Sequence, residues 1–268
     1  MSFSEETHPS AGCDTNLSLG AARPKYCAQC GAVWLPDWNS CPLCSAQPTP
    51  RSVQYSGIGA ALSLYFTLLA LSIIGIVAIG SGARLVQTEF ALLGLQAIII
   101  VVWCAVSWRL ALPALTARVH PGWFLAAAGL ALCTFGVAAG FLTFLHRASN
   151  IPLLHYAAPI LRAGYGWSTV VLTVAVMPAV FEELAFRGVI LTSLTRVMGS
   201  TEAGVVSAFM FMVLHLSVPS FPHLLLMGLA LAYIRLKSGS VLPGMLLHFT
   251  HNLLCVVAEH RVGPHFFL

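Results

Sequence analysis

Charged side chains are scarce in this sequence. Asp, Glu, Lys and Arg together make up 8% of the 268 residues, whereas hydrophobic residues make up 58%. An ordinary soluble domain carries about 25% charged residues. The net charge is only +4 and no run of five basic residues occurs, which argues against nucleic acid as the main partner. The composition predicts an integral membrane protein whose principal surroundings are a lipid bilayer.

Aspartate is missing altogether after residue 50, since Asp14 and Asp37 both lie in the polar N-terminal part. An intramembrane aspartyl protease needs two membrane aspartates, so that class is excluded. No His-Glu-x-x-His sequence occurs, which excludes a conventional zincin site. A Gly-x-Ser-x-Gly elbow is also absent. The acids that remain after residue 50 are Glu89, Glu182, Glu183, Glu202 and Glu259.

Long apolar windows of roughly 20 residues suit helices that cross a bilayer. The windows are about Ile58–Ile79, Phe90–Trp108, Trp123–Leu145, Ser168–Phe186, Gly204–Leu216, Phe221–Leu236 and Val241–Ala258. An eighth, Val189–Met198, is too short to cross alone and is either a continuation or an interfacial helix. The predicted fold is all-α: a polytopic membrane helix bundle of seven to eight spans over residues 58–260.

Basic residues are distributed unevenly between the ends of these windows. Arg23, Lys25 and Arg51 precede the first window, Arg109 and Arg118 lie between the second and third, and Arg84 lies between the first and second. The positive-inside rule then predicts a cytoplasmic N-terminus. We expect the protein in a bacterial inner (plasma) membrane.

A small cysteine module precedes the bundle. Residues 1–20 form a polar, predicted disordered leader, residues 21–46 a module, and residues 47–57 a linker. Four thiols in two Cys-x-x-Cys knuckles suit one tetrahedral zinc: they are Cys27, Cys30, Cys41 and Cys44. The alternatives are two disulfides or an iron site. A closed site of four thiolates predicts structural zinc and a role in binding a protein partner.

The segment Phe181–Arg187 places two carboxylates and a guanidinium in an apolar window. Charged groups inside a bilayer are costly and mark functional sites. Glu183 and Arg187 are four residues apart and can pair on one helical face, which leaves Glu182 without a local counter-ion and available as a general base. The alternative is that both glutamates join one buried ion network with Arg187.

Two further polar sets occur in later windows. His215 ends an apolar helix, and His248 and Asn252 lie four residues apart on one face of another. Taken alone, His215 and His223 are equally well explained as hydrogen-bonded core histidines. His248 and Asn252 would serve equally well as interhelical hydrogen-bonding residues.

Glu-Glu-x-x-x-Arg, then Phe-x-x-x-His, then His-x-x-x-Asn, each in its own window, resembles the CAAX-processing and bacteriocin-processing (CPBP, or Abi) family of intramembrane endopeptidases. Residues of about 168–258 carry the resemblance, and the cysteine module is an addition to it. The resemblance implies hydrolysis of a peptide bond in a membrane-associated or lipidated protein or peptide, without specifying whether the substrate is prenylated.

The resemblance also implies the role of each site residue. Glu182 would be the principal catalytic carboxylate, with His215 helping it to activate water. Glu183 and Arg187 would support them, and His248 and Asn252 would donate hydrogen bonds to the oxyanion. A metal held by Glu182, His215 and His248 is the alternative to a metal-free mechanism. His251 is not a motif position, and we expect it either to pack in the bundle or to support the site residues from behind.

Two rival functions fit the same composition. Intramembrane charges also mark ion paths, so a membrane transporter is the first. A non-catalytic membrane scaffold that recruits a partner through the cysteine module is the second. Substitution of Glu182 distinguishes the three functions. It would abolish peptide cleavage by a protease, abolish solute flux through a transporter, and leave the phenotype of a scaffold unchanged.

Overall fold

The computed structural model describes residues 25–26, 33–34, 51–78, 83–149 and 155–262. The leader 1–20 and the predicted zinc ligands Cys27, Cys30, Cys41 and Cys44 lie outside these residues. Two short strands of the module are described: β1 (Lys25–Tyr26) pairs antiparallel with β2 (Val33–Trp34), with Lys25 opposite Trp34.

The rest of the described chain is helical. The α-helices are α1 (Arg51–Ala78), α2 (Ala83–Val106), α3 (Trp108–Thr116), α4 (Gly122–Ser149), α5 (Ala157–Arg162), α6 (Trp167–Val170), α7 (Met177–Glu183), α8 (Leu191–Leu194), α9 (Ser200–Leu214), α10 (Phe221–Ser238) and α11 (Leu242–Val262). Two π-helical stretches, η1 (Val171–Val176) and η2 (Leu184–Ile190), flank α7, and the 3₁₀ turn η3 (Val218–Ser220) joins α9 to α10.

Each of the seven predicted apolar windows is helical over most of its described residues, so the all-α prediction is confirmed for the described part of the bundle. Five helices of this part are long and apolar enough to cross a membrane: Ile58–Val77, Arg84–Val106, Gly122–Ser149, Trp167–Leu194 and Val218–Ser238. The chain is an integral membrane protein. The shorter α9 is also apolar, whereas α11 carries His248, Asn252 and Glu259 among its apolar residues.

One helix boundary differs from the sequence prediction, and the structure decides between the two readings of another segment. α1 begins at Arg51, inside the predicted linker of residues 47–57. A helix can extend beyond the roughly 20 residues that are needed to cross a bilayer. The short window Val189–Met198 is no separate helix: η2 and α8 continue the span that starts at Trp167 and ends at Leu194. The first of the two readings of that window is therefore correct.

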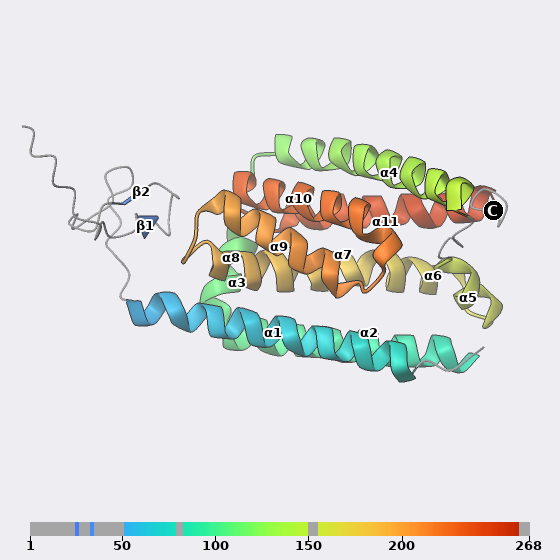
Figure 1. Cartoon of the computed structure of the whole chain (residues 1–268), viewed down its shortest axis with the longest axis horizontal. Coiled ribbons are helices and arrows are strands. Elements are labelled where there is room, and N and C mark those ends of the chain that lie inside the picture. The colour runs from blue at the N-terminus through green and yellow to red at the C-terminus, as the bar shows by residue number, and fades with distance from the viewer. Residues whose placement is uncertain (1–24, 27–32, 35–50, 79–82, 150–154, 263–268) are drawn as a thin grey trace, which may run out of the picture.

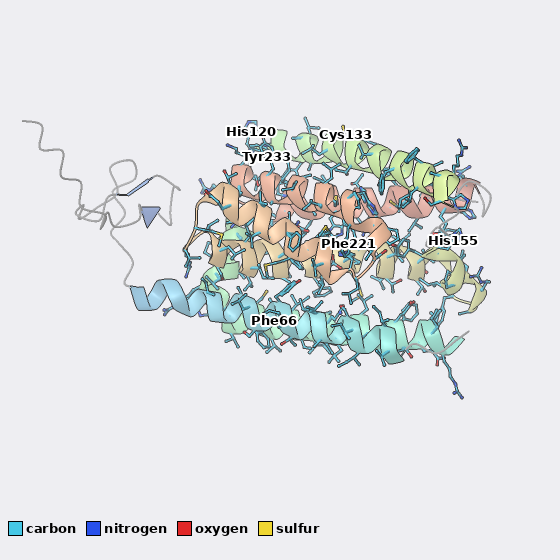
Figure 2. The ribbon with its side chains drawn as sticks, viewed as in Figure 1. Phe66, His120, Cys133, His155, Phe221 and Tyr233 are labelled. Atoms are coloured by element: carbon cyan, nitrogen blue, oxygen red, sulfur yellow. The ribbon has the colours of Figure 1, made fainter. Side chains whose placement is uncertain are left out.

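The helices form layers around this long span (Figure 1). α1 and α2 lie together along one side, α4 covers the opposite side, and α9, α10, α11 and the Trp167–Leu194 span lie between them. The core contains Phe186, Phe211 and Leu231, all with at most 1% of their surface exposed. Outward-facing apolar side chains such as Phe66 and Tyr233 (Figure 2) suit contact with lipid.

α9 and α10 form a tightly packed hairpin. A Cβ added to Gly228 on α10 would lie 3.0 Å from the backbone Cα of Ala208 on α9. Small residues permit such close approach between membrane helices. The turn of this hairpin begins at His215, and Leu216 in it has a positive φ of 51°.

Candidate active site

Glu183 and Arg187 form a fully buried ion pair. Both side chains have 0% exposure, and Arg187 Nη1 donates to Glu183 Oε1 across 2.8 Å. Arg187 Nη2 donates to the backbone carbonyl of Gly228 at 3.1 Å, which ties the pair to α10. The predicted pairing of these two residues is confirmed. The geometry follows from the four-residue spacing, which brings the two side chains to one face.

Glu182 is placed differently from its neighbour. Its side chain is 26% exposed, and its Oε2 has no hydrogen-bond partner among the described residues. The nearest ionisable partner is His248, whose Nε2 lies 4.0 Å from this oxygen. That separation is too long for a direct hydrogen bond. Of the two adjacent carboxylates, Glu183 is held in an ion pair, whereas Glu182 has a partly exposed side chain and a buried Oε2 that accepts no hydrogen bond from the described residues.

His248, on α11, connects the two carboxylates. The ring is 3% exposed, and its Nδ1 lies 3.2 Å from Glu183 Oε1. Because Arg187 already donates to this oxygen, Glu183 is an acceptor and Nδ1 of His248 is the donor. The tautomer is thereby fixed, and Nε2 is the atom that faces Glu182. A Cβ on Gly244, one turn earlier, would lie 3.0 Å from Glu183 Oε2, so α11 passes very close to the pair.

Phe211, on α9, packs against the other side of this cluster. Its ring centroid lies 4.7 Å from that of His215 and 5.9 Å from that of His248, and the Arg187 guanidinium carbon lies 4.7 Å from it. His215 is exposed, and its Nδ1 donates to the carbonyl of Phe211 at 2.8 Å. No hydrogen bond or ion pair among the described residues joins His215 to Glu182, and the Phe211 ring packs between His215 and the side chains of His248 and Arg187.

Asn252 and His251 face other parts of the bundle. The amide of Asn252 donates to the backbone carbonyl of Val174 in η1 at 3.0 Å. His251 is buried, and its Nδ1 lies 3.0 Å from the hydroxyl of Thr134 on α4. That hydroxyl donates to the carbonyl of Ala131, so the imidazole is the donor to Thr134. Sequence reasoning missed Thr134, because a single threonine in an apolar window carries no distinguishing pattern.

No group of three or more His, Cys, Asp or Glu side chains in the described ranges is arranged to hold a metal ion. As placed, Glu182, His215 and His248 do not form such a set, since only Glu182 and His248 face each other. The four cysteines of the module fall outside the residues on which this statement rests.

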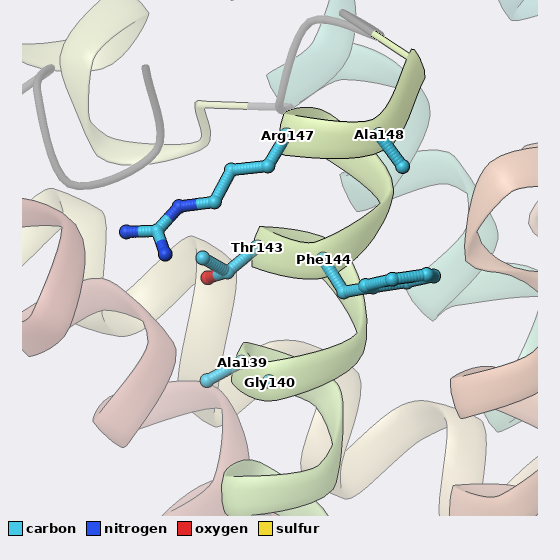
Figure 3. Close-up of a pocket in the computed structure, with 6 residues that line it drawn as sticks. All are labelled: Ala139, Gly140, Thr143, Phe144, Arg147 and Ala148. Atoms are coloured by element: carbon cyan, nitrogen blue, oxygen red, sulfur yellow. The ribbon is translucent and has the colours of Figure 1, made fainter.

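A hollow on the surface of α4 is separate from the cluster. It is lined by residues of that helix alone (Figure 3): Ala139, Gly140, Thr143, Phe144, Arg147 and Ala148. None of them is a predicted site residue.

The cluster of acids and histidines lies within one stretch of sequence. Residues 162–254 match the family model described as type II CAAX prenyl endopeptidase Rce1-like. This region resembles a CAAX-type protease. The match to Rce1-like proteins includes all six predicted catalytic positions and supports the resemblance to the CPBP family, although it spans less than half of the chain. No curated protein and no solved structure matches this chain.

Proposed function

We propose that this protein is an intramembrane endopeptidase that hydrolyses a peptide bond in a membrane-associated or lipidated protein or peptide. The observation that carries the proposal is the contrast between two adjacent carboxylates. Glu183 is fully buried and committed to Arg187 and His248, whereas Glu182 is partly exposed and unpaired. A general base needs a free oxygen that substrate and water can reach.

Water is the nucleophile in the proposed reaction. Glu182 takes a proton from it, with His215 assisting from the end of α9, and the hydroxide adds to the peptide carbonyl carbon. The carbon–nitrogen bond then breaks, and the leaving amine takes the proton from Glu182. This proton transfer returns Glu182 to its carboxylate form, and a new water molecule replaces the one that was consumed, so the peptide and water are the only reactants.

His248 stabilises the oxyanion that forms on the peptide carbonyl. Its Nδ1 donates to Glu183, so Nε2 carries a proton only in the imidazolium form. The Glu182 carboxylate oxygen Oε2 lies 4.0 Å from this nitrogen. Loss of one oxyanion donor costs about 10²–10³ in kcat in other hydrolases. Buried Arg187 compensates the charge of Glu183, which leaves Glu182 for chemistry.

The wider arrangement follows the sequence analysis. In this proposal α9 and α11 lie in the bilayer with the five long apolar spans, the N-terminus is cytoplasmic, and the membrane is a bacterial plasma membrane. The Rce1-like match favours lipidated substrates with a C-terminal CAAX sequence.

The module of residues 21–46 holds one structural zinc through its four cysteines and binds a protein partner. Whether Glu182, His215 and His248 gather around a second metal is decided by metal analysis of the purified protein.

Comparison of protein termini in membranes tests the proposal. Host cells produce the wild type, Glu182→Gln or Glu202→Gln at equal abundance, and new N-termini are identified by mass spectrometry. Glu202 is exposed at the start of α9, so it provides the same substitution away from the cluster. We expect new termini in cells with the wild type and with Glu202→Gln, and none in cells with Glu182→Gln. Identical termini in all three, or a loss of solute flux in their place, would refute the protease function.

A further inference from the structure

Pro178 interrupts the backbone of the long span shortly before Glu182. It is the second residue of α7 and lies inside the continuous apolar segment Trp167–Leu194. In an α-helix the N–H of residue 178 would donate to the carbonyl of Val174, but proline has no N–H and its ring crowds that carbonyl. The preceding residue, Met177, donates to the carbonyl of Leu172, five residues back, in the π-helical pattern of η1. Residue 178 therefore offers no N–H to the Val174 carbonyl.

Asn252 of α11 donates to this same carbonyl. Its amide nitrogen lies 3.0 Å from Val174 O. A carbonyl can only accept a hydrogen bond, so the orientation of the amide is fixed by its partner. A side chain from another helix thus supplies the hydrogen bond that Pro178 cannot make. Membrane helices with an internal proline are tolerated where a neighbouring helix satisfies the freed backbone group in this way.

The contact also fixes where His248 lies. α11 packs along both η1 and α7, and His248 is four residues before Asn252 on the same helical face. A shift of α11 along the long span would move both contacts together. The bond at Val174 and the bond from His248 to Glu183 are two points that fix the register of these helices.

We infer that Asn252 is a positioning residue. It replaces the N–H that is missing at Pro178 and holds α11 so that His248 lies between Glu182 and Glu183. Its effect on turnover rests on the proposed protease function, whereas its structural bond to Val174 does not. This role differs from direct donation to the oxyanion, which the family resemblance implies for this residue.

A double-mutant cycle separates the two roles, using Asn252→Ala, Pro178→Ala and the double variant. Pro178→Ala returns an N–H to the helix, so Val174 no longer depends on Asn252. Turnover is measured on equal amounts of folded protein, with the substrate that the comparison of termini identifies. We expect Asn252→Ala to lower kcat roughly tenfold in the wild type, with KM little changed, and less than about threefold in the Pro178→Ala background.

Thr173→Ala provides the matched background. Thr173 is adjacent to Val174, and its hydroxyl donates to the carbonyl of Thr169 within the same helix. Its removal does not provide a donor for Val174, so Asn252→Ala should cost as much in this background as in the wild type. Equal loss of kcat in the wild-type and Pro178→Ala backgrounds would overturn the inference. It would indicate that Asn252 acts directly on the substrate.

Thermal unfolding of the same variants tests the bond without any substrate. We expect Asn252→Ala to destabilise the wild type more than it destabilises Pro178→Ala. If Asn252→Ala does not accumulate in membranes, we expect the double variant with Pro178→Ala to accumulate at the wild-type level. A double variant that also fails to accumulate would contradict the inference. If no cleavage depends on Glu182, the protease proposal fails, but the unfolding cycle still tests the role of Asn252.

Discussion

Glu183 and His248 are held together by a hydrogen bond of 3.2 Å between helices that are separated by 65 positions in sequence. The same Glu183 oxygen accepts a hydrogen bond from Arg187 at 2.8 Å. One buried carboxylate oxygen therefore unites an ion pair within the Trp167–Leu194 span with the histidine of α11. The mutual position of Glu182 and His248 depends on this junction.

Substitution of Arg187 by Met should destabilise the protein strongly. It leaves the buried charge of Glu183 without its counter-ion, for which the expected cost is about 3–5 kcal/mol. Thermal unfolding of purified protein in detergent, followed by tryptophan fluorescence, measures the effect. Arg162→Met is the control, because Arg162 is exposed at the end of α5. Equal stability of the two variants would show that the ion pair contributes little to the fold.

Replacing Gly228 by Ala should weaken the α9–α10 hairpin by about 1–3 kcal/mol. The new Cβ would meet backbone atoms of Ala208 at 3.0–3.1 Å, and backbone cannot move aside as a flexible side chain can. Gly129→Ala on α4 is the matched change, since nothing lies within 4 Å of a Cβ there. We expect Gly129→Ala to be neutral or slightly stabilising. A destabilisation of equal size at both glycines would contradict the tight packing of this hairpin.

Leu216→Gly should relieve strain in the turn after His215. Leu216 has a φ of 51°, a left-handed conformation that costs an L-residue roughly 1–2 kcal/mol. Glycine adopts it freely, at the expense of greater entropy in the unfolded chain. Chemical unfolding should show a variant that is as stable as the wild type or more stable. A loss of more than about 1 kcal/mol would mean that contacts of the leucine side chain outweigh the strain.

Thr134→Val should loosen the contact between α4 and α11. The substitution keeps the shape but removes the hydroxyl that receives the Nδ1–H of buried His251. A buried donor left without a partner costs about 1–3 kcal/mol. Thr116→Val is the comparison, because that hydroxyl is exposed and bonds only within α3. The inter-helix bond would be disproved as a stabilising contact if both variants unfolded at the wild-type temperature.

The cysteine module should bind one zinc ion per chain. Elemental analysis of purified wild type and Cys44→Ser measures this directly, and we expect zinc to be lost in the variant while Glu182-dependent cleavage remains. Cys133→Ser, at an exposed thiol of α4, should keep the zinc. Zinc that persists in Cys44→Ser and disappears in a His215→Ala variant would place the metal at the active site.

Local features of the structure could be predicted from sequence. Apolar windows are helical because backbone groups in lipid must bond within their own segment, and Glu183 pairs with Arg187 because residues four apart share a helical face. Both arguments concern residues within a single helix, so they do not require knowledge of which helices are neighbours. They also left Glu182 without a local counter-ion, and its only ion-pair contact within 4.0 Å among the described residues is with His248 of α11.

Contacts between helices could not be predicted in the same way. The partners of His251 and Asn252 are Thr134 and the carbonyl of Val174, which depend on which helices are neighbours and in which register. The family resemblance implies that His215 helps Glu182 to activate water, and this stays a prediction; the packing of the Phe211 ring against His215 at the end of α9 depends on the tertiary structure. Sequence reasoning did not single out Pro178, and its consequence for Asn252 depends on the packing of α11.

The most direct test of the central claim is hydrolysis by the purified protein in ¹⁸O-labelled water. Wild type, Glu182→Gln and Glu202→Gln are each reconstituted in lipid nanodiscs with the substrate that cellular termini identify. Peptide hydrolysis by water places ¹⁸O in the carboxylate of the new C-terminus, and mass spectrometry detects it. We predict labelled product with wild type and Glu202→Gln, and at least a 10³-fold slower reaction with Glu182→Gln, roughly the contribution of a general base. Labelled product formed equally fast by Glu182→Gln, or no product from any of the three, would contradict the account.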